Sequence, residues 1–364
     1  MALQSFKKQH QSVEPLASRQ VFLDTQVYRA LGHNPANRAM ALLKEHVISH
    51  RVVLHTTDIT LREVKRQIRE RVFARQRELN AMEKDLARWR KSAPRAAPTR
   101  AIEFEAETLS TELFQQFEYF LRNECKARVH EAFAVAPAVV FENYFDRKPP
   151  FDGDDSKEFP DGFVVEALVQ WCREHGDQMH VVTEDKAMTR AVAADERLLA
   201  LKNIHEVLTR AAADLGANGE AIAEAVLDHP AFDSSLEAAL RHQMKEVVYV
   251  YVGDLPDGEA YEGKLLSIEE VSGWSVVGLS DRRVSLILDA RLKVRVEVQY
   301  EDRDGAIYDG EDDRWFGAET TSTEVDDEID VEILVEVERE TGIVREARVL
   351  NQEVSINGPS DQDY

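Results

Sequence analysis

The sequence contains only two cysteines, Cys125 and Cys172, and no apolar run approaches the length of a membrane span. Two distant cysteines exclude a disulfide framework and a cysteine-rich zinc site, so we expect both thiols to be reduced. A bilayer-spanning helix needs roughly 20 apolar residues, which this chain lacks. The first residues also lack the apolar core of a signal peptide. We therefore expect a cytoplasmic protein with no membrane partner.

Basic residues are fewer than acidic ones. The chain has 45 Lys and Arg and 68 Asp and Glu, which gives a net charge of -23. Most of the deficit falls in residues 246–364, where 31 acidic and 11 basic residues give a net charge of -20. Residues 1–245 are nearly neutral, and residues 62–100 hold 13 basic against 5 acidic residues. The total charge therefore does not exclude nucleic acid as a partner of the first part of the chain.

The first 212 residues have the pattern of an α/β domain. Short apolar segments at residues 20–24, 51–57 and 180–183 predict buried strands. Between residues 161 and 175, apolar residues recur every three or four positions, which predicts a helix with one buried face. Strands that alternate with helices favour a parallel sheet covered by helices, as in Rossmann-like folds.

The rest of the chain divides by the spacing of its apolar residues and by its composition. Charged helical segments on both sides of a Pro-containing break predict a helical-hairpin insertion, and alternating Val and Ile after residue 246 predict a smaller antiparallel β domain. With 364 residues, two domains are expected. The predicted organisation is an N-terminal extension at 1–18, an α/β domain at 19–212 with the insertion at 63–122, a helical linker at 213–245 and an acidic β-rich domain at 246–364.

Four acidic residues occupy strand-to-helix junctions of the predicted α/β domain. Asp24 ends the first strand, Glu63 lies in the first turns of the helix after the second strand, and Asp185 follows the third strand. Asp161 comes directly after a proline at a helix start. Ligands of open parallel sheets bind outside the carboxyl ends of the strands. We therefore expect these four carboxylates to meet in one crevice.

Four converging carboxylates need a partner of opposite charge. Two carboxylates about 4 Å apart repel by roughly 4 kcal/mol at an effective dielectric near 20, so the set must take up protons or bind a divalent cation. Oxygen ligands suit Mg²⁺ or Mn²⁺, and such ions can activate water against a phosphodiester. Taken singly, Asp24 is better explained as a helix cap and Glu63 as a solvated residue, so the prediction depends on the ordered set of four. Asp58 and Glu184 flank the assigned acids, and they become the ligands if the assignment of acids to site positions is off by one.

Several segments resemble the PIN-domain nuclease family. Val21–Thr25 is similar to its opening strand, and Thr57–Val64 is similar to its second strand-to-helix step. Lys157–Asp161 resembles the third-acid motif of a subfamily with the sequence Lys-Glu-Phe-Pro-Asp. His180–Asp185 resembles the strand before the fourth acid, and Ile204–Leu208 resembles the closing segment. The resemblance covers about residues 19–212.

This resemblance implies a Rossmann-like PIN fold and Mg²⁺- or Mn²⁺-dependent cleavage of RNA. The implied catalytic metal ligands are Asp24, Glu63, Asp161 and Asp185. Thr183 would orient these ligands, and Glu158 would support the third acid. Two positions depart from the family pattern, because Gln26 stands where many members have Asn and Ala187 replaces a common acid. Because all four primary acids remain, we expect a competent site, and a weakened second metal position is the alternative.

The two charged regions predict partners. Lys65, Arg66, Arg69 and Arg75 are candidates for binding a phosphate backbone, and the alternative is a solvated helical hairpin. The acidic region 246–364 predicts a homo-oligomer contact or a basic protein partner, or a domain that occludes the basic helix.

The favoured function is a metal-dependent endoribonuclease, with a toxin or defence effector as its biological role. A structure-specific DNA nuclease is the alternative enzyme. A catalytically silent PIN scaffold, which binds partners through its acidic domain, is the alternative without catalysis.

Overall fold

The computed structural model describes residues 9–10, 13–93, 104–153, 159–303, 306–309, 314–351 and 353–358. The chain divides into two compact units, and each is described by itself. The first, here called the α/β unit, comprises residues 15–211. The second, here called the β-rich unit, comprises residues 1–14 and 212–364.

A five-stranded parallel sheet forms the centre of the α/β unit. Its strand order is β4-β3-β2-β5-β6, and all four pairings between neighbours are parallel. The strands are β2 (Gln20–Leu23), β3 (Val53–Thr57), β4 (Arg128–His130), β5 (Met179–Val182) and β6 (Leu198–Leu201). Because β2 is the central strand, its carboxyl end lies between those of β3 and β5.

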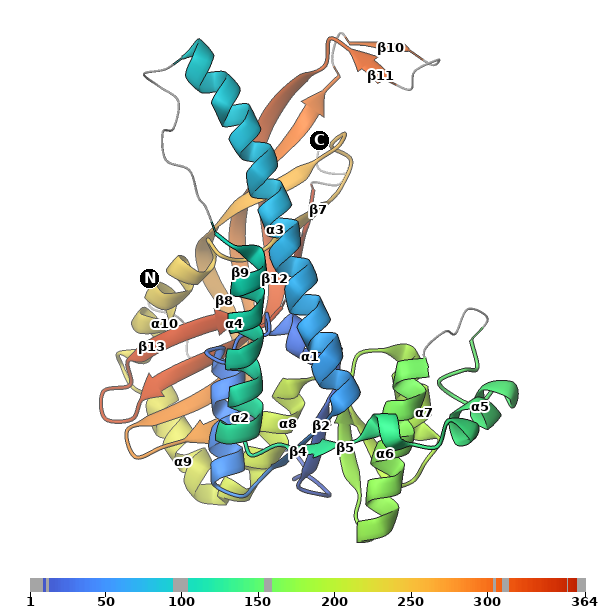
Figure 1. The fold of residues 1–364 in the computed structure, drawn as a ribbon. Helices are drawn as coiled ribbons and strands as arrows, with labels where there is room; N and C mark the ends of the chain where they lie inside the picture. Colours follow the sequence, from blue (N-terminus) through green and yellow to red (C-terminus); the bar gives the residue numbers. More distant parts are fainter. Residues whose placement is uncertain are drawn as a thin grey trace. The chain divides into compact units, whose positions relative to one another are not determined.

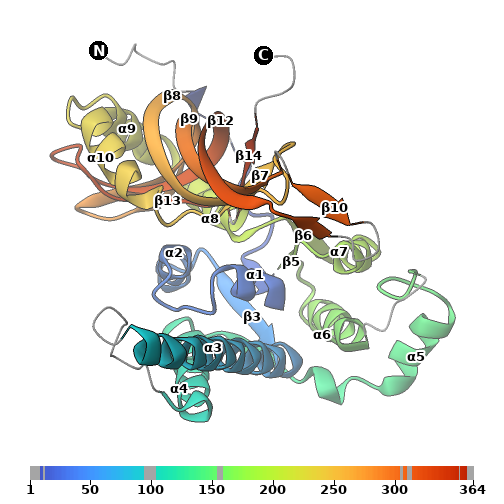
Figure 2. The same cartoon turned by 90° about the horizontal axis from the view of Figure 1, so that it is seen from above.

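Helical segments connect these strands (Figure 1). They are α1 (Thr25–Ala30), α2 (Arg38–Ile48), α3 (Asp58–Ser92), α4 (Ala106–Tyr119), the π-helical η1 (Phe120–Glu124), the 3-10 turn η2 (Ala132–Ala134), α5 (Pro137–Phe145), α6 (Phe159–His175), α7 (Lys186–Ala193) and α8 (Ile204–Ala212). Figure 2 shows α1 and α2 on one side of the strands and α6 and α7 on the other. On the α6 side, Phe22 and Val181 of the sheet pack with Leu168 and Met188 in one hydrophobic cluster.

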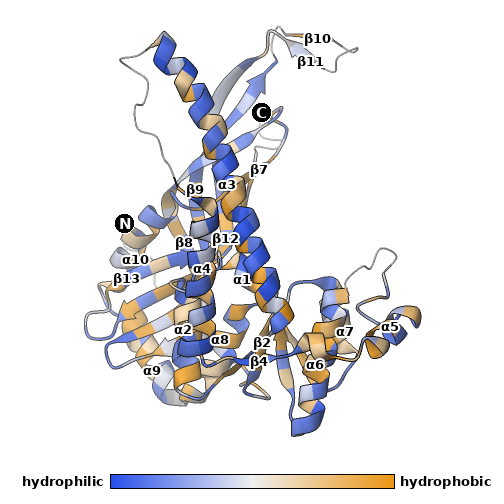
Figure 3. Cartoon of the chain, in the orientation of Figure 1, coloured by the Kyte–Doolittle hydropathy of each residue, from blue (hydrophilic) through white to orange (hydrophobic). Residues whose placement is uncertain are grey.

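The parallel sheet with helices confirms the predicted α/β fold. The helical-hairpin insertion corresponds to α3 and α4, and α4 packs along α3. In α3 the buried apolar residues end at Val72, and the remaining turns carry mainly polar residues (Figure 3). Helix α3 is therefore held by packing at its start, and its second half is exposed.

A sheet of long strands forms the β-rich unit. Its order is β1-β8-β9-β12-β13, antiparallel except for the parallel pairing of β1 with β8. Smaller two-stranded sheets are formed by β7 with β14 and by β10 with β11. The strands are β1 (Gln9–His10), β7 (Tyr249–Val252), β8 (Glu259–Leu279), β9 (Arg283–Asp302), β10 (Ile307–Asp309), β11 (Arg314–Phe316), β12 (Glu319–Glu338), β13 (Val344–Val349) and β14 (Val354–Asn357). This separate sheet confirms the predicted antiparallel β domain.

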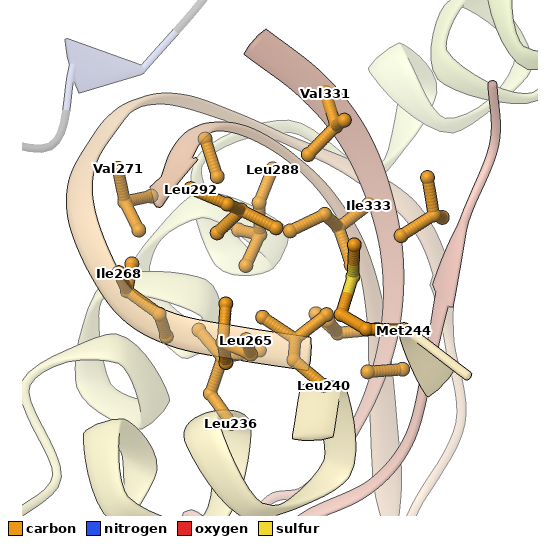
Figure 4. Packing of buried hydrophobic residues seen from close by; sticks show 14 of the residues in the cluster. Leu236, Leu240, Met244, Leu265, Ile268, Val271, Leu288, Leu292, Val331 and Ile333 are labelled. Carbon is orange, nitrogen blue, oxygen red and sulfur yellow. The ribbon is translucent and has the colours of Figure 1, made fainter. Parts of the chain in front are cut away.

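Two helices complete the core of the β-rich unit. The short turn η3 (Ala213–Leu215) leads into α9 (Gly216–Leu227), and α10 (Phe232–Gln243) follows. Leu236, Leu240 and Met244 pack against Leu265 and Leu288 of the sheet (Figure 4). The alternating pattern of the strands gives the sheet this apolar face, and the two helices cover it. The segment 213–245, expected as a linker, therefore contributes to this core, and residues 1–14 of the expected extension are grouped with the same unit.

Two expectations about composition can be compared with the described residues. Cys125 and Cys172 are both buried free thiols. Among the described helices, none combines the length and the apolar character needed to cross a bilayer.

Candidate active site

Asp24 is a buried carboxylate at the carboxyl end of the central strand. It caps the N-terminus of α1, where Oδ1 accepts a hydrogen bond of 2.6 Å from the backbone N–H of Thr25. The Thr183 hydroxyl donates to Oδ2 at 2.8 Å. Only 8% of Asp24 is exposed. Burial raises its pKa and the charge of Asp185 raises it further, although the hydrogen bonds from Thr183 and Thr25 act in the opposite direction.

Glu63 lies near Asp24, in the second turn of α3. The pKa of Glu63 is raised, first by burial and then by the negative charge of Asp24, and Arg66 and a hydrogen bond from Thr25 oppose this rise. Thr25 therefore hydrogen-bonds both acids. Sequence reasoning did not assign a role to this residue, although its position directly after the first acid could have indicated one.

Asp185 starts α7 and joins the same electrostatic neighbourhood. It caps this helix by accepting a 2.8 Å hydrogen bond from the backbone N–H of Met188. Its own backbone N–H donates to the Thr183 hydroxyl at 3.1 Å. Thr183 thus connects the two carboxylates, since its hydroxyl also donates to Asp24.

Asp161 occupies the first turn of α6 and is half-buried. It follows Phe159 and Pro160, which line a pocket together with Glu63. The structure therefore brings the start of α6 to the same region as α3. Glu158, the expected supporting residue, lies outside the described residues, as does Lys157 of the motif.

The neighbouring acids have other roles in the structure. Asp58 begins α3, and its Oδ1 accepts hydrogen bonds from the backbone N–H groups of Ile59 at 2.9 Å and Ala132 at 2.8 Å. Glu184 is exposed. Asp58 thus holds the backbone of Ile59 and Ala132, whereas Glu63 and Asp185 are the acids that interact electrostatically with Asp24.

The expected phosphate-binding residues differ in their surroundings. Lys65 lies over the Phe114 ring, 5.5 Å from its centroid. Arg69 pairs with Glu107 at 3.0 Å, and Arg75 pairs with Glu78 at 2.6 Å. Arg66 lines the pocket with Glu63, and its contact with Glu70 is long, at 3.8 Å. Of the four, Arg66 is the one that lines the pocket with Glu63 and acts on its charge.

The pocket beside Glu63 has a volume of about 390 Å³ and is mainly apolar. It is formed by the start of α3, by η2 and by the start of α6. Its lining residues are Ile59, Arg62, Glu63, Arg66, Phe133, Phe159, Pro160 and Phe163. Sequence reasoning did not single out Arg62 or Phe133, because Phe133 joins the pocket only through the fold.

Known families provide an independent comparison with this geometry. Residues 21–188 match a family model described as PIN domain. The match begins in β2 and ends in α7, so it includes all four predicted acids. PIN domains are generally nucleases, and they generally use divalent metals such as Mg²⁺ or Mn²⁺. The match does not resolve the Lys-Glu-Phe-Pro-Asp subfamily, which stays a prediction. No curated protein and no solved structure matches the chain.

The carboxylate oxygens of Asp24 and its neighbouring acids fit a hydrated divalent cation. Burial and like charge both raise the pKa values of Asp24 and Glu63, so a nearby cation would relieve the repulsion between them. Within the described residues, no group of three or more His, Cys, Asp or Glu side chains is placed to hold a metal ion. Mg²⁺ usually keeps several waters and needs only one or two protein carboxylates. The carboxylates of the α/β unit therefore fit an Mg²⁺ or Mn²⁺ ion that keeps most of its bound waters.

Proposed function

We propose that the PIN domain of this chain is a metal-dependent endoribonuclease that hydrolyses RNA phosphodiester bonds. The observation that carries this proposal is the buried Asp24 carboxylate. It shares Thr183 with Asp185 and couples electrostatically to Glu63 at the carboxyl end of the central strand. A structural helix cap alone would not require three acids at one such edge.

Each residue of the proposed site would have its own role in cleavage. One or two of the acids Asp24, Glu63, Asp161 and Asp185 would bind Mg²⁺ or Mn²⁺ directly, and the others would bind its water ligands. Thr183 and Thr25 would fix the orientation of the Asp24 carboxylate. When bound, the cation supplies Lewis acidity that activates water and stabilises the leaving oxygen. Arg66, on the edge of the pocket, is positioned to attract the phosphate of the substrate.

Substitution of Asp24 by Asn tests the proposal sharply. Asn is as good a helix cap as Asp, so α1 should stay intact while the negative charge is lost. The purified full chain is incubated with labelled RNA and DNA of the same sequence, in Mg²⁺, Mn²⁺ or EDTA. We expect Asp24→Asn and Asp161→Asn to lower the cleavage rate of RNA at least about a hundredfold, the scale on which one preorganised charged group acts. Glu184→Gln, at an exposed neighbouring acid, is the matched control and should cleave as wild type.

The alternatives predict different outcomes. Cleavage that survives both substitutions or persists in EDTA would contradict the metal-site assignment. Faster cleavage of DNA than of RNA would favour a DNA nuclease. A wild-type chain that binds RNA without cutting it would favour the catalytically silent scaffold. The toxin or defence-effector role stays a prediction.

A further inference from the structure

The apolar pocket is lined by one of the four acids, Glu63, and its other lining residues have no assigned role in holding a cation. Phe133 on its wall is 54% exposed, an unusually open position for a phenylalanine beside a carboxylate site. Phe159 lines the same pocket and packs against the Phe151 ring, with 5.2 Å between the ring centroids. The pocket therefore presents aromatic surface to solvent at the place where a substrate must approach.

The position of Phe133 is fixed by its neighbours. The Asp58 carboxylate accepts a hydrogen bond from the backbone N–H of Ala132, and Ala132 is fully buried. On the ring itself, the guanidinium of Arg62 lies 4.4 Å from the centroid. The ring and the guanidinium plane thus form a preordered pair, which lowers the entropic cost of placing a flat ligand against them.

The charges around the pocket select the class of ligand. Arg62 and Arg66 are exposed on α3 and attract an anion, whereas Glu63 disfavours a phosphate inside the pocket itself. An unpaired nucleobase meets both conditions, because it is flat and uncharged and carries its phosphate outside. Unpaired bases stack on aromatic rings and on Arg guanidinium planes.

We propose that this pocket is a base-stacking subsite, in which Phe133 and Arg62 hold one unpaired base of a single-stranded substrate next to the scissile phosphate. The inference rests on the proposed nuclease function. It adds the chemical group that the pocket binds and a positioning role for Phe133. A base inside a duplex stays stacked on its neighbours, so a paired strand would not fill the subsite.

Binding measurements test the subsite separately from cleavage. Full-length chain carrying Asp24→Asn is titrated into a fluorescent single-stranded RNA 12-mer, and anisotropy gives Kd. We expect Phe133→Ala to weaken binding about tenfold, since stacking of one base contributes about 1–3 kcal/mol by alanine substitution. Phe133→Trp should restore the affinity. Phe145→Ala is the matched control, because Phe145 is 76% exposed and does not line the pocket, and it should bind as the parent chain.

An abasic scan of the same 12-mer identifies a stacked base. One abasic position should weaken binding about tenfold with Phe133 present and have little effect after Phe133→Ala. Equal losses for Phe133→Ala and Phe145→Ala, additive effects of every abasic position, or no RNA binding at all would each overturn the subsite. If wild-type chain cleaves RNA and Phe133→Ala changes neither Kd nor rate, the nuclease proposal stands and the subsite alone fails.

Discussion

Thr183 is the residue on which the geometry of the acids most depends. Its hydroxyl is buried, donates to Asp24 and accepts from the backbone N–H of Asp185. The hydrogen bond to Asp24 stabilises the ionised carboxylate and so lowers a pKa that burial raises. The Thr183 hydroxyl therefore favours the charged form of the Asp24 carboxylate and restricts its orientation.

Replacement of Thr183 by Val should shift the pH dependence of cleavage. Without the donor, the pKa of Asp24 rises further, and the carboxylate takes up a proton at a higher pH. Activity that requires the ionised form is lost as pH falls through this pKa, so the acidic limb of the rate profile should move to higher pH. We expect the midpoint of this limb to rise by about one pH unit, the effect of one hydrogen bond to a charged group. Thr183→Ser should keep the wild-type profile, and a Val variant whose rate is lower by the same factor at every pH would contradict this role.

His55 is a second buried titratable residue, away from the acids. It is completely buried in β3, and it hydrogen-bonds His130 at 2.7 Å and Gln20 at 2.8 Å. Burial, followed by the charges of His130 and Arg128, lowers its pKa to about 3. The folded chain therefore holds His55 neutral, whereas an unfolded chain protonates it near pH 6.5.

Acid should therefore destabilise the α/β unit through His55. Above about pH 6.5 both states are neutral at this residue, and below it the unfolded state binds the extra proton, so stability falls as pH drops from about 6.5 towards 3. The slope for one such group is about 1.4 kcal/mol per pH unit. Urea unfolding at pH 7.5, 6.5 and 5.5 should show a smaller loss for His55→Asn than for wild type. His50→Asn, at an exposed position, is the control, and an equal pH dependence in all three chains would contradict the prediction.

At the level of elements, the sequence predicted those parts of the fold that have strong local patterns. The strand at 20–24, the strand before Thr57 and the helix at 161–175 all correspond to observed elements, because apolar periodicity reports burial. Strands β4 and β6 were not predicted. Strand β4 has only three residues, and both segments are strands because they pair with β3 and β5. Their identity depends on tertiary pairing, which a local pattern does not contain.

In the candidate site too, some features follow from local sequence and others only from tertiary packing. The acids could be proposed from their positions at strand-to-helix junctions, and Asp161 from the proline before it. Arg62 and Phe133 could not, because Phe133 reaches α3 only through the connection between β4 and α5. Contacts between elements distant in the chain are set by packing, so the sequence could propose the acids but not the pocket that Glu63 lines.

Gly162 allows the close packing that places the first turn of α6. A Cβ atom at this position would lie 2.5 Å from the Phe151 ring and 3.1 Å from Val140. Phe151 and Val140 are both buried and cannot swing into solvent. A glycine here therefore lets α6 approach α5 directly, and it holds the turn that carries Asp161.

Gly162→Ala should consequently cost both stability and activity. Overpacking of this kind costs about 1–3 kcal/mol, and the strain would displace the turn that carries Asp161. We expect a lower urea midpoint and a cleavage rate reduced about tenfold or more, as a displacement of about 1 Å in a site can produce. Gly153→Ala, where a Cβ would meet nothing within 4 Å, is the control and should change neither quantity. Wild-type stability for Gly162→Ala would show that the Phe151 ring can move aside.

At the scale of the whole molecule, charge and structure divide at different residues. The acidic excess begins near residue 246, but the β-rich unit begins at residue 212. Helices α9 and α10 lie between these positions and bury apolar side chains against the sheet, among them Val226, Leu236 and Leu240. A composition boundary therefore does not mark the end of a folding unit in this chain.

The choice of truncation point tests this division. A chain of residues 13–212 keeps the whole α/β unit and should be a soluble monomer that melts cooperatively, because the unit has its own hydrophobic cluster. A chain of residues 13–245 keeps α9 and α10 without the sheet that covers Leu236, Leu240 and Met244, so it should expose a contiguous apolar surface and aggregate. Size-exclusion chromatography with light scattering and thermal melting of both chains give the measurement. Equal solubility of the two would mean that α9 and α10 can fold without the sheet, and aggregation of the shorter chain would mean that the α/β unit does not fold independently.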